Sequence, residues 1–469
     1  MAQILSPLDS TFFHLEDGHA SMHIASLAIF EGPAPSQAQV REAISRKLPL
    51  VPRYRQRIRS VPFNLGRPVW VDYPDFDLDQ HVHRVSVPAP GGLAELQDLM
   101  GQLMSESLDR DLPVWEDWVV EGLADGRWAM ITKLHHSMAD GISGTDLLST
   151  VFDHSPEPGP APEDGWDPAP EPGAAQLAAA AVRSRARVPV REVAALAHLA
   201  RNPRSTALQA WALGRGLAGF AAAALPVSGS SLNGPLQGDR LFRWTEVPLE
   251  DVAGVRSVLG GTVNDVVLAA VARAFRELLL ARDEHLGPHA VRTLVPVSVR
   301  REDQHGSPDN RVSAILAELP VEDADPVDRL GDVSARMRRL KSSHEAEAGE
   351  VVTELADLVP PAALASALHV AFRVPHRFLN AVTTNVPGPR STLYFAGRRM
   401  LATYPYVPLG DRVRVGVAVT SYEGRLLFGV TADAASSRDV DVFLGGLEEG
   451  FRELQKAALD RQAGPPRDA

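Results

Sequence analysis

The stretch from Lys133 to Ser143, KLHHSMADGIS, contains two adjacent histidines, an aspartate four residues after the second histidine, and then a glycine. It continues an apolar and partly alternating run at 128–134 (WAMITKL), which is typical of a strand. Asp140 and Gly141 predict a turn into a following helix. The two histidines are therefore predicted at a strand-to-helix junction, where α/β proteins tend to place working side chains.

Three interpretations fit this junction. In a metal site His135, His136 and Asp140 would be the ligands, but adjacent histidines on an extended segment point in opposite directions, and no second ligand cluster is evident. The histidines could also be hydrogen-bonded parts of a turn. Because histidine is suited to proton transfer near neutral pH, the pattern favours catalysis, with one histidine at the site and its neighbour packing or orienting.

The bulk composition restricts the class of protein. The chain has 469 residues, of which 45% are hydrophobic and 23% charged, which favours a soluble globular protein of two domains. Its net charge of -12 disfavours a nucleic-acid partner, and the lack of cysteine removes thiolate nucleophiles and zinc-thiolate sites. The first residues, MAQILSPLDSTFF, lack the pattern of a secretory signal, so a cytoplasmic protein is expected.

Strand and helix patterns alternate on both sides of a proline-rich segment. Apolar periodicity predicts a strand at 23–30, helices at 36–50, 93–108 and 263–280, and strands at 291–299 and within 404–431. A further helix is expected from a cap at Asp325 to residue 343. The composition of 154–173 forbids regular structure. We therefore expect an N-terminal domain at 1–153, a linker and helical crossover at 154–240, and a C-terminal domain at 241–469.

The helical crossover is basic, although the protein as a whole is acidic. Between residues 176 and 225 it holds seven arginines and one acidic residue. This composition fits a helix on an anionic membrane or lipid-droplet surface, and it also fits a bridging helix with a solvated arginine face. A membrane-spanning helix is disfavoured because Arg215 lies near the middle of the most apolar window.

HHSMADG has the H-H-x-x-x-D-G form of the acyltransferases built like chloramphenicol acetyltransferase. These include peptide-synthetase condensation domains and the bacterial wax ester synthase/diacylglycerol acyltransferases. Further stretches resemble the latter family, in the same order and over nearly the whole chain: LSPLDSTFFHLE at 5–16, PVWE at 113–116, TVNDVVLAAVARAFR at 262–276, LVPVSVR at 294–300 and TTNVPGP at 383–389. One departure is Val114, where the family has leucine, and an apolar exchange leaves packing intact.

The resemblance implies an α/β (α+β) fold of two chloramphenicol-acetyltransferase-like domains. Each domain would be a mixed sheet with flanking helices, and the proline-rich crossover and the Ala/Arg-rich helices would join them. The implied reaction moves a fatty acyl group from acyl-CoA to diacylglycerol or a long-chain alcohol, without a cofactor or metal. A condensation-type enzyme that uses carrier-protein thioesters and a non-catalytic lipid-surface protein are the alternatives.

The resemblance also implies roles for particular residues. His136 would be the general base and His135 an orienting neighbour. Asp140 would pair with an arginine, for which Arg300 is a candidate. Gly141 would permit a tight course of the backbone. The residues implied to contact substrate are Asn264, Asp265, Pro113, Trp115 and Asn385. From the residues alone, 264–265 is also an ordinary helix cap, 113–115 a buried turn and 385–389 a bend. The basic run 336–341 would either meet the phosphates of coenzyme A or form a solvated helix face.

Overall fold

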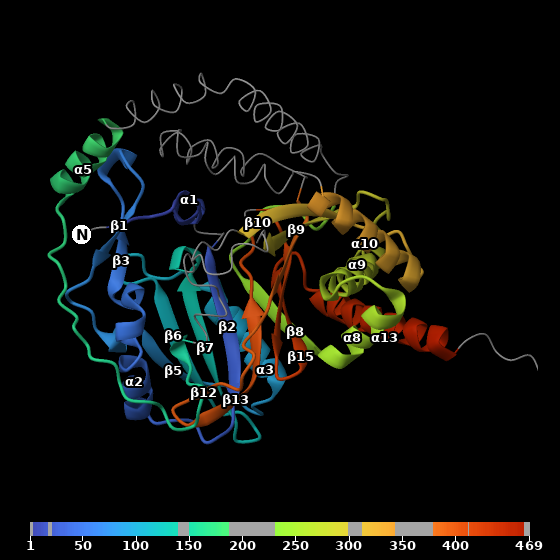
Figure 1. The fold of residues 1–469 in the computed structure, drawn as a ribbon, viewed down its shortest axis with the longest axis horizontal. Coiled ribbons are helices and arrows are strands. Elements are labelled where there is room, and N and C mark those ends of the chain that lie inside the picture. Colours follow the sequence, from blue (N-terminus) through green and yellow to red (C-terminus); the bar gives the residue numbers. More distant parts are fainter. Residues whose placement is uncertain are drawn as a thin grey trace, which may run out of the picture.

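The computed structural model describes residues 3–16, 21–138, 150–186, 230–298, 312–342, 379–410 and 412–463. Within these residues two six-stranded mixed sheets lie side by side, and a small three-stranded sheet flanks the first (Figure 1). The α/β fold class is thereby confirmed.

The first sheet has the order β12-β13-β2-β7-β6-β5, in which only β5 and β6 run parallel. Its strands are β2 (His23–Phe30), β5 (Val82–Ser86), β6 (Trp115–Glu121), β7 (Trp128–His135), β12 (Tyr394–Phe395) and β13 (Arg398–Tyr406). Helices α2 (Gln37–Ser45) and α3 (Leu93–Ser105) contribute to its core. The C-terminal half of the chain thus supplies two strands to the N-terminal sheet.

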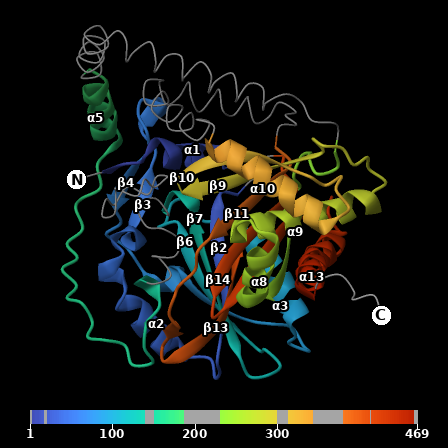
Figure 2. The ribbon, with the colours of Figure 1, turned by 45° about the vertical axis from the view of Figure 1, so that its right-hand side comes forward.

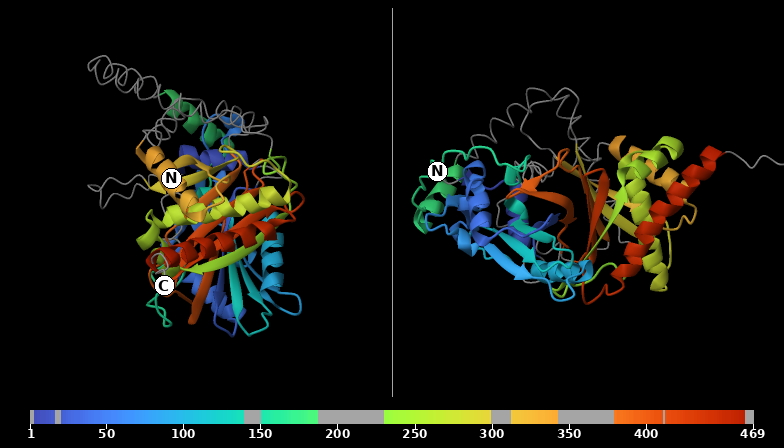
Figure 3. Two further views of the ribbon diagram at one scale, coloured as in Figure 1. Left: turned by 90° about the vertical axis from the view of Figure 1, so that its right-hand side faces the viewer. Right: turned by 90° about the horizontal axis from the view of Figure 1, so that it is seen from below.

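The second sheet has the order β10-β9-β11-β14-β15-β8, with β11 parallel to both neighbours. Its strands are β8 (Arg240–Pro248), β9 (Val291–Ser298), β10 (Val312–Leu319), β11 (Ala381–Val386), β14 (Val415–Tyr422) and β15 (Arg425–Asp433). The helices α8 (Leu249–Leu259), α9 (Val263–Ala281), α10 (Pro326–Ser342) and α13 (Val440–Ala463) cover its outer face (Figures 2 and 3).

The remaining elements also belong to the N-terminal half of the chain and flank the first sheet. The three-stranded sheet consists of β1 (Gln3–Ile4), β4 (Val69–Asp72) and β3 (Gln56–Arg59). Helix α1 (Pro7–Leu15) follows β1, and α5 (Ala174–Ala186) lies at the outer edge (Figure 1). Short 3-10 turns are η1 (Leu48–Leu50), η2 (Pro52–Arg55), η3 (Pro62–Asn64), η4 (Leu78–Gln80) and η5 (His136–Met138).

Local signals explain where several helices begin. Ser36 caps α2 and Thr262 caps α9, each through a reciprocal capping box that satisfies free backbone N–H groups. Asp325 accepts from two backbone N–H groups at the start of α10, as expected. The predicted strands at 23–30 and 128–134 and the helix at 263–280 are confirmed, whereas the helix expected at 36–50 is shorter and ends at Ser45.

Two hydrophobic cores meet at the junction of the sheets. The first core includes side chains from the second sheet, among them Phe242, Trp244 and Leu427. Gly429 on β15 approaches β13 so closely that an added Cβ would lie 1.8 Å from the carbonyl oxygen of Pro405. The sheets are therefore packed backbone to backbone at this point.

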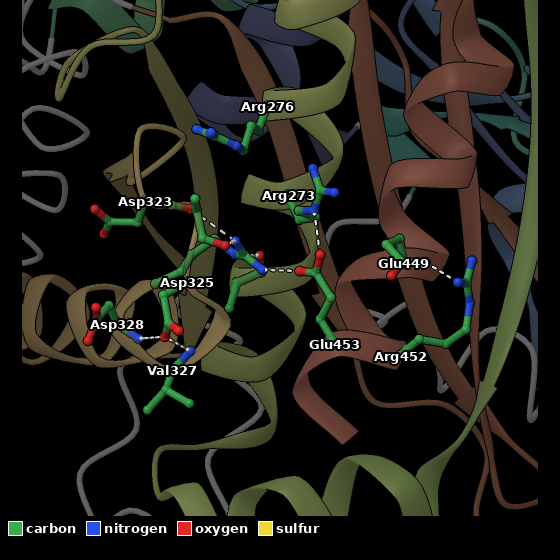
Figure 4. A network of polar contacts seen from close by, with 12 residues as sticks. Arg273, Arg276, Asp323, Asp325, Val327, Asp328, Glu449, Arg452 and Glu453 are labelled. Atoms are coloured by element: carbon green, nitrogen blue, oxygen red, sulfur yellow. Dashed lines mark hydrogen bonds and ion pairs between the residues drawn. The ribbon is translucent and has the colours of Figure 1, made fainter. Parts of the chain in front are cut away.

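The helices of the second domain are joined by a charge network around one buried arginine (Figure 4). Arg329 on α10 is 0% exposed, and it donates to Glu453 on α13 at 2.8 Å and to the carbonyl of Ala269 on α9 at 3.2 Å. Arg273 on α9 donates to the other carboxylate oxygen of Glu453. One carboxylate thus fixes three helices to one another.

Residues 154–173 form no helix or strand, as expected, but they are held tightly against the N-terminal domain, and we call them the strap. The Arg55 guanidinium donates two hydrogen bonds to Asp164, at 2.8 and 3.0 Å, and lies 4.3 Å from the ring centroid of Trp166. Glu171 pairs with Arg57 and Arg59. In Figure 1 the strap runs along the outer side of the molecule from below α2 up to α5.

The expected domain boundaries stay a prediction, although the position of β12 and β13 shows that the first sheet takes strands from beyond residue 240. The helix expected after Gly141 and most of the basic crossover lie outside the described residues. Of the crossover, α5 is described and is helical, as predicted.

Candidate active site

The two histidines lie where the central strand of the first sheet ends. β7 pairs with β2 and β6, and all eight of its residues are buried, as is typical of a strand covered on both faces. His135 is its last residue and is 1% exposed, whereas His136 begins the turn η5 and is half-buried. The strand and the turn therefore place the neighbouring imidazoles in different environments.

Helix α1 packs directly onto this turn. The hydroxyl of Ser137 donates to the carbonyl of Asp9 at 3.0 Å. The ring of Phe12 lies 4.0 Å from that of His136, with 31° between their planes, and Phe13 meets His135 edge-on at 6.0 Å. Each residue of the segment 135–137 therefore contacts α1.

The proton position on His135 follows from its two neighbours. The backbone N–H of Ser137 donates to Nδ1 at 3.1 Å, so Nδ1 is the acceptor and the proton is assigned to Nε2. Nε2 lies 3.2 Å from the Glu16 carboxylate, whose side chain is 6% exposed. Burial acts to raise the pKa of Glu16, but the contact with His135, the Met22 N–H and the charge of Arg110 together lower it. Glu16 is therefore ionised near neutral pH.

Two further buried groups lie on the same face of the sheet. The Lys133 ammonium donates to the carbonyls of Leu103 and Glu106, at 3.0 and 2.6 Å, and so caps the C-terminal end of α3. His23, paired with His135 in the ladder, bonds the carbonyl of Met104 at 3.0 Å. Burial, with the charge of Lys133, lowers the pKa of His23 to about 3, so this imidazole is neutral.

Pro113 and Trp115 lie in and beside β6, the neighbour of the histidine strand. Trp115 is 1% exposed, donates to the carbonyl of Tyr54 at 2.9 Å and stacks between Tyr54 and His81. The carbonyl of Val114 accepts from the backbone N–H of His135 at 2.9 Å. In this structure the segment supports the histidine strand, and contact with substrate stays a prediction for both residues.

Asn264 and Asn385 are brought together from α9 and β11. Nδ2 of Asn385 donates to Oδ1 of Asn264 at 3.3 Å, and Asn264 is half-buried. Asp265 is 5% exposed, and its carboxylate accepts from the Thr262 N–H in the capping box of α9. The helix cap considered from sequence is therefore present, with Asn264 beside it.

Several expected site residues lie outside the described residues: Asp140, Gly141 and Arg300. In the basic run 336–341, Arg336 lies 3.3 Å from the carboxylates of Glu322 and Asp332, while Arg338, Arg339 and Lys341 are exposed. Among the described residues no group of three or more His, Asp or Glu side chains could hold a metal ion.

Sequence reasoning missed the role of α1 and of Glu16. The signal was present, because Asp9, Phe12, Phe13 and Glu16 follow the spacing i, i+3, i+4 and i+7 that places residues on one helix face. What the spacing could not reveal is that this face meets residues more than 100 positions later in the chain.

Comparisons with known proteins bear out the resemblance. The family model described as the wax ester synthase/diacylglycerol acyltransferase catalytic domain matches residues 5–267, and that of the C-terminal domain of this family matches residues 309–455. A putative diacylglycerol O-acyltransferase of Mycobacterium bovis and a probable one of Mycobacterium tuberculosis are each 38% identical over 454 residues, covering 96% of this chain and 95% of theirs.

Solved structures agree. The wax ester synthase/diacylglycerol acyltransferase from Marinobacter aquaeolei VT8 has a TM-score of 0.68 and 27% identity, covering 98% of this chain and 100% of that one. The first condensation domain of the calcium-dependent antibiotic synthetase has a TM-score of 0.60 at 16% identity, covering 98% and 97%, a likeness of fold alone. The chain therefore belongs to the wax ester synthase/diacylglycerol acyltransferase family, and it is an acyltransferase.

Proposed function

We propose that the protein transfers a long-chain fatty acyl group from acyl-CoA to the hydroxyl of diacylglycerol, of a long-chain alcohol, or of both. The observation that carries this proposal is the placement of His136. Its half-buried imidazole begins a turn at the end of a fully buried strand, and the neighbouring His135 is held by two polar contacts. The names of its relatives support the substrate class.

In the proposed reaction, His136 acts as a general base on the acceptor hydroxyl. The alcohol oxygen attacks the thioester carbonyl while the imidazole takes the hydroxyl proton, an arrangement worth about 10²- to 10⁴-fold in rate. Collapse of the tetrahedral intermediate breaks the carbon–sulfur bond, and the imidazolium returns the proton to the coenzyme A sulfur. No covalent acyl-enzyme forms.

Asn264 and backbone N–H groups near Gly141 are our candidates for stabilising the oxyanion, a type of contact worth about 3–4 kcal/mol per donor. The contact with Asn385 supports this role, because an amide whose oxygen accepts from a neighbour can turn its N–H groups toward another acceptor. We assign Asp140 to holding the histidine loop through an arginine, with Arg300 as the candidate.

The proposal is tested with the His136→Ala variant. Thiol release from acyl-CoA in the presence of diacylglycerol or a long-chain alcohol is expected to fall by about 10²-fold or more. The matched control is His285→Ala, which removes an exposed imidazole from a loop of the second domain and is expected to leave the rate unchanged. Full activity in His136→Ala contradicts the role of His136 as the general base. If the wild type turns over only carrier-bound acyl donors and not acyl-CoA, the protein is a condensation-type enzyme.

We further propose that the protein contacts a membrane or lipid droplet peripherally, since its acceptors partition into lipid. Phe63, in the turn η3, is 92% exposed, and Val182 on α5 is 54% exposed. The two elements adjoin, and Ala181 of α5 also lies against Gly66, which follows η3. Among the described residues no single helix is long and apolar enough to cross a membrane, and only the pair α8 and α9, bent by 99°, meets those criteria together.

The membrane proposal predicts that a smaller fraction of the Phe63→Asp protein than of the wild type sediments together with anionic phospholipid vesicles. Loss of one buried aromatic side chain corresponds to about 2 kcal/mol, or roughly thirtyfold in partitioning. Activity on a short-chain, water-soluble acceptor serves as the control and is expected to stay unchanged. Equal vesicle binding by Phe63→Asp and the wild type would locate the lipid contact elsewhere.

A further inference from the structure

One face of α1 and its C-terminal cap residue hold the histidine turn. Asp9 accepts from the Ser137 hydroxyl, Phe12 lies on the ring of His136, and Glu16 lies 3.2 Å from Nε2 of His135. These contacts join residues that are more than 100 positions apart in the sequence. Because they meet three consecutive residues, they define both the path of the turn and the orientation of its side chains.

We propose that Glu16 is a positioning residue for the acyl transfer, acting on His136 through His135. The carboxylate lies 3.2 Å from Nε2 of His135 and attracts the proton on that nitrogen, which leaves Nδ1 as the acceptor for the backbone N–H of Ser137. That hydrogen bond fixes the turn in which His136 lies. The inference rests on the proposed role of His136 as the base.

The surroundings of Glu16 hold the carboxylate in place. The backbone N–H of Met22 donates to the same oxygen, Oε2, at 3.0 Å. Arg110 provides positive charge near Glu16, and it is itself fixed by a hydrogen bond to the carbonyl of Phe13 at 2.6 Å and by its position 3.7 Å above that ring. The charged and titratable groups that face this pair are therefore Arg110, His23 and Lys133.

A second backbone contact shows that the turn, rather than the side chain alone, is fixed. The N–H of His136 donates to the carbonyl of Met22 at 2.8 Å, so residue 22 binds both Glu16 and the backbone of the base. Loss of the carboxylate frees the imidazole of His135 to take its other tautomer. A proton on Nδ1 would then face the N–H of Ser137, and two donors cannot bond to each other.

The expected effect is on turnover rather than on substrate binding, because neither Glu16 nor His135 is exposed to substrate. In Glu16→Ala, kcat is expected to fall about 10- to 100-fold, the cost of a small misplacement of a reacting group, with KM for both substrates unchanged. In Glu16→Gln a neutral oxygen acceptor remains, so a smaller loss is expected.

Histidine 15N NMR of the full-length protein reports the tautomer of His135. This tautomer would not change if Glu16 only stabilised the fold. The wild type is expected to show His135 in the Nε2–H tautomer alone. Glu16→Gln is expected to show a mixture of tautomers, and Glu16→Ala the largest share of the Nδ1–H form. The share of the Nδ1–H form should rise as kcat falls. Glu171→Gln is the matched control, since it removes a carboxylate that contacts basic side chains far from the histidines, and it is expected to show the wild-type spectrum and kcat.

The outcomes separate this inference from the proposed function. The positioning role is overturned if Glu16→Ala has the wild-type kcat, or if its kcat falls while the tautomer of His135 stays unchanged. In either case an inactive His136→Ala still supports His136 as the base. Full activity in His136→Ala overturns the proposed function instead. If Glu16→Ala does not fold, Glu16→Gln decides, and a wild-type spectrum in that variant overturns the inference.

Discussion

Two buried side chains near the histidines have pKa values displaced in opposite senses. The pKa of His23 is lowered to about 3 by burial and by Lys133. Burial raises the pKa of Asp117, on β6, to about 7, with a smaller opposing effect from the hydroxyl of Thr132. Both side chains are therefore uncharged in mildly acidic solution, where the unfolded chain would ionise them.

These displacements make opposite contributions to the pH dependence of stability. Between about pH 3 and 6.5 the unfolded chain protonates His23 and the folded protein does not, so stability rises with pH. Between about pH 3.8 and 7 the unfolded chain ionises Asp117 and the folded protein does not, so stability falls as pH rises. Over the shared range the two slopes cancel.

Single variants are expected to reveal each slope. In Asp117→Asn the free energy of unfolding should rise between about pH 4.5 and 6.5 by up to about 1.4 kcal/mol per pH unit, and in His23→Gln it should fall by a similar amount. Urea titrations at several pH values measure both. A wild-type slope as steep as that of either variant would contradict the cancellation.

At the level of elements, the strap is an ordered part of the N-terminal domain rather than a free linker. Its acidic residues face the basic strand β3 and the turn η2. The Arg55 side chain is only 7% exposed, whereas that of Asp164 is 49% exposed, so the arginine forms the buried half of the contact. A planar guanidinium can make both the paired hydrogen bonds and the stacking on Trp166.

Arg55→Lys keeps the charge but loses the planar guanidinium, which stacks on Trp166 while its Nη1 donates to both oxygens of Asp164, so the strap is expected to detach more often. We expect proteolysis within 154–173 to be about 5- to 30-fold faster, corresponding to about 1–2 kcal/mol of lost contact. Cleavage reports the open population when opening and closing are fast. Arg183→Lys, an exposed position on α5, is the control, and equal cleavage of both variants would show that the strap is held elsewhere.

Several elements could be predicted because their signals are local. The strand at 128–134 and the helix at 263–280 follow from apolar periodicity, and the start of α10 follows from the Asp325 cap. The position of β13 beside β2 could not be predicted, since pairing between segments so far apart leaves no periodic trace in either. For the same reason the stretch 5–16 resembles the family without revealing that Glu16 contacts His135.

For the molecule as a whole, the junction between the sheets is a place of close backbone packing. Gly429 meets the backbone of Pro405 and the ring of Phe242, so neither neighbour can yield easily to an added methyl group. Arg243 on β8 also pairs with Asp98 on α3 and Asp441 on α13, across the same junction. The two halves therefore form one packed body along β13 and β15.

Gly429→Ala is expected to push the sheets apart and to destabilise the protein by about 1–3 kcal/mol or more. The matched control is Gly445→Ala in α13, where an added Cβ meets nothing within 4 Å and helix propensity favours alanine by about 1 kcal/mol. Thermal unfolding measures both changes. A Gly429→Ala protein as stable as the wild type would show that the junction has room to adjust.

The position of β13 has a consequence for how the protein is made. The first sheet holds the histidine strand, yet β2 lacks its partner on one side until residue 406 has left the ribosome. During synthesis, at about 5–20 residues per second, an apolar strand edge is therefore exposed for a period in which it could pair with another chain. A gene divided at the strap would not yield two autonomous halves, because the first half would lack the strand that closes its own sheet.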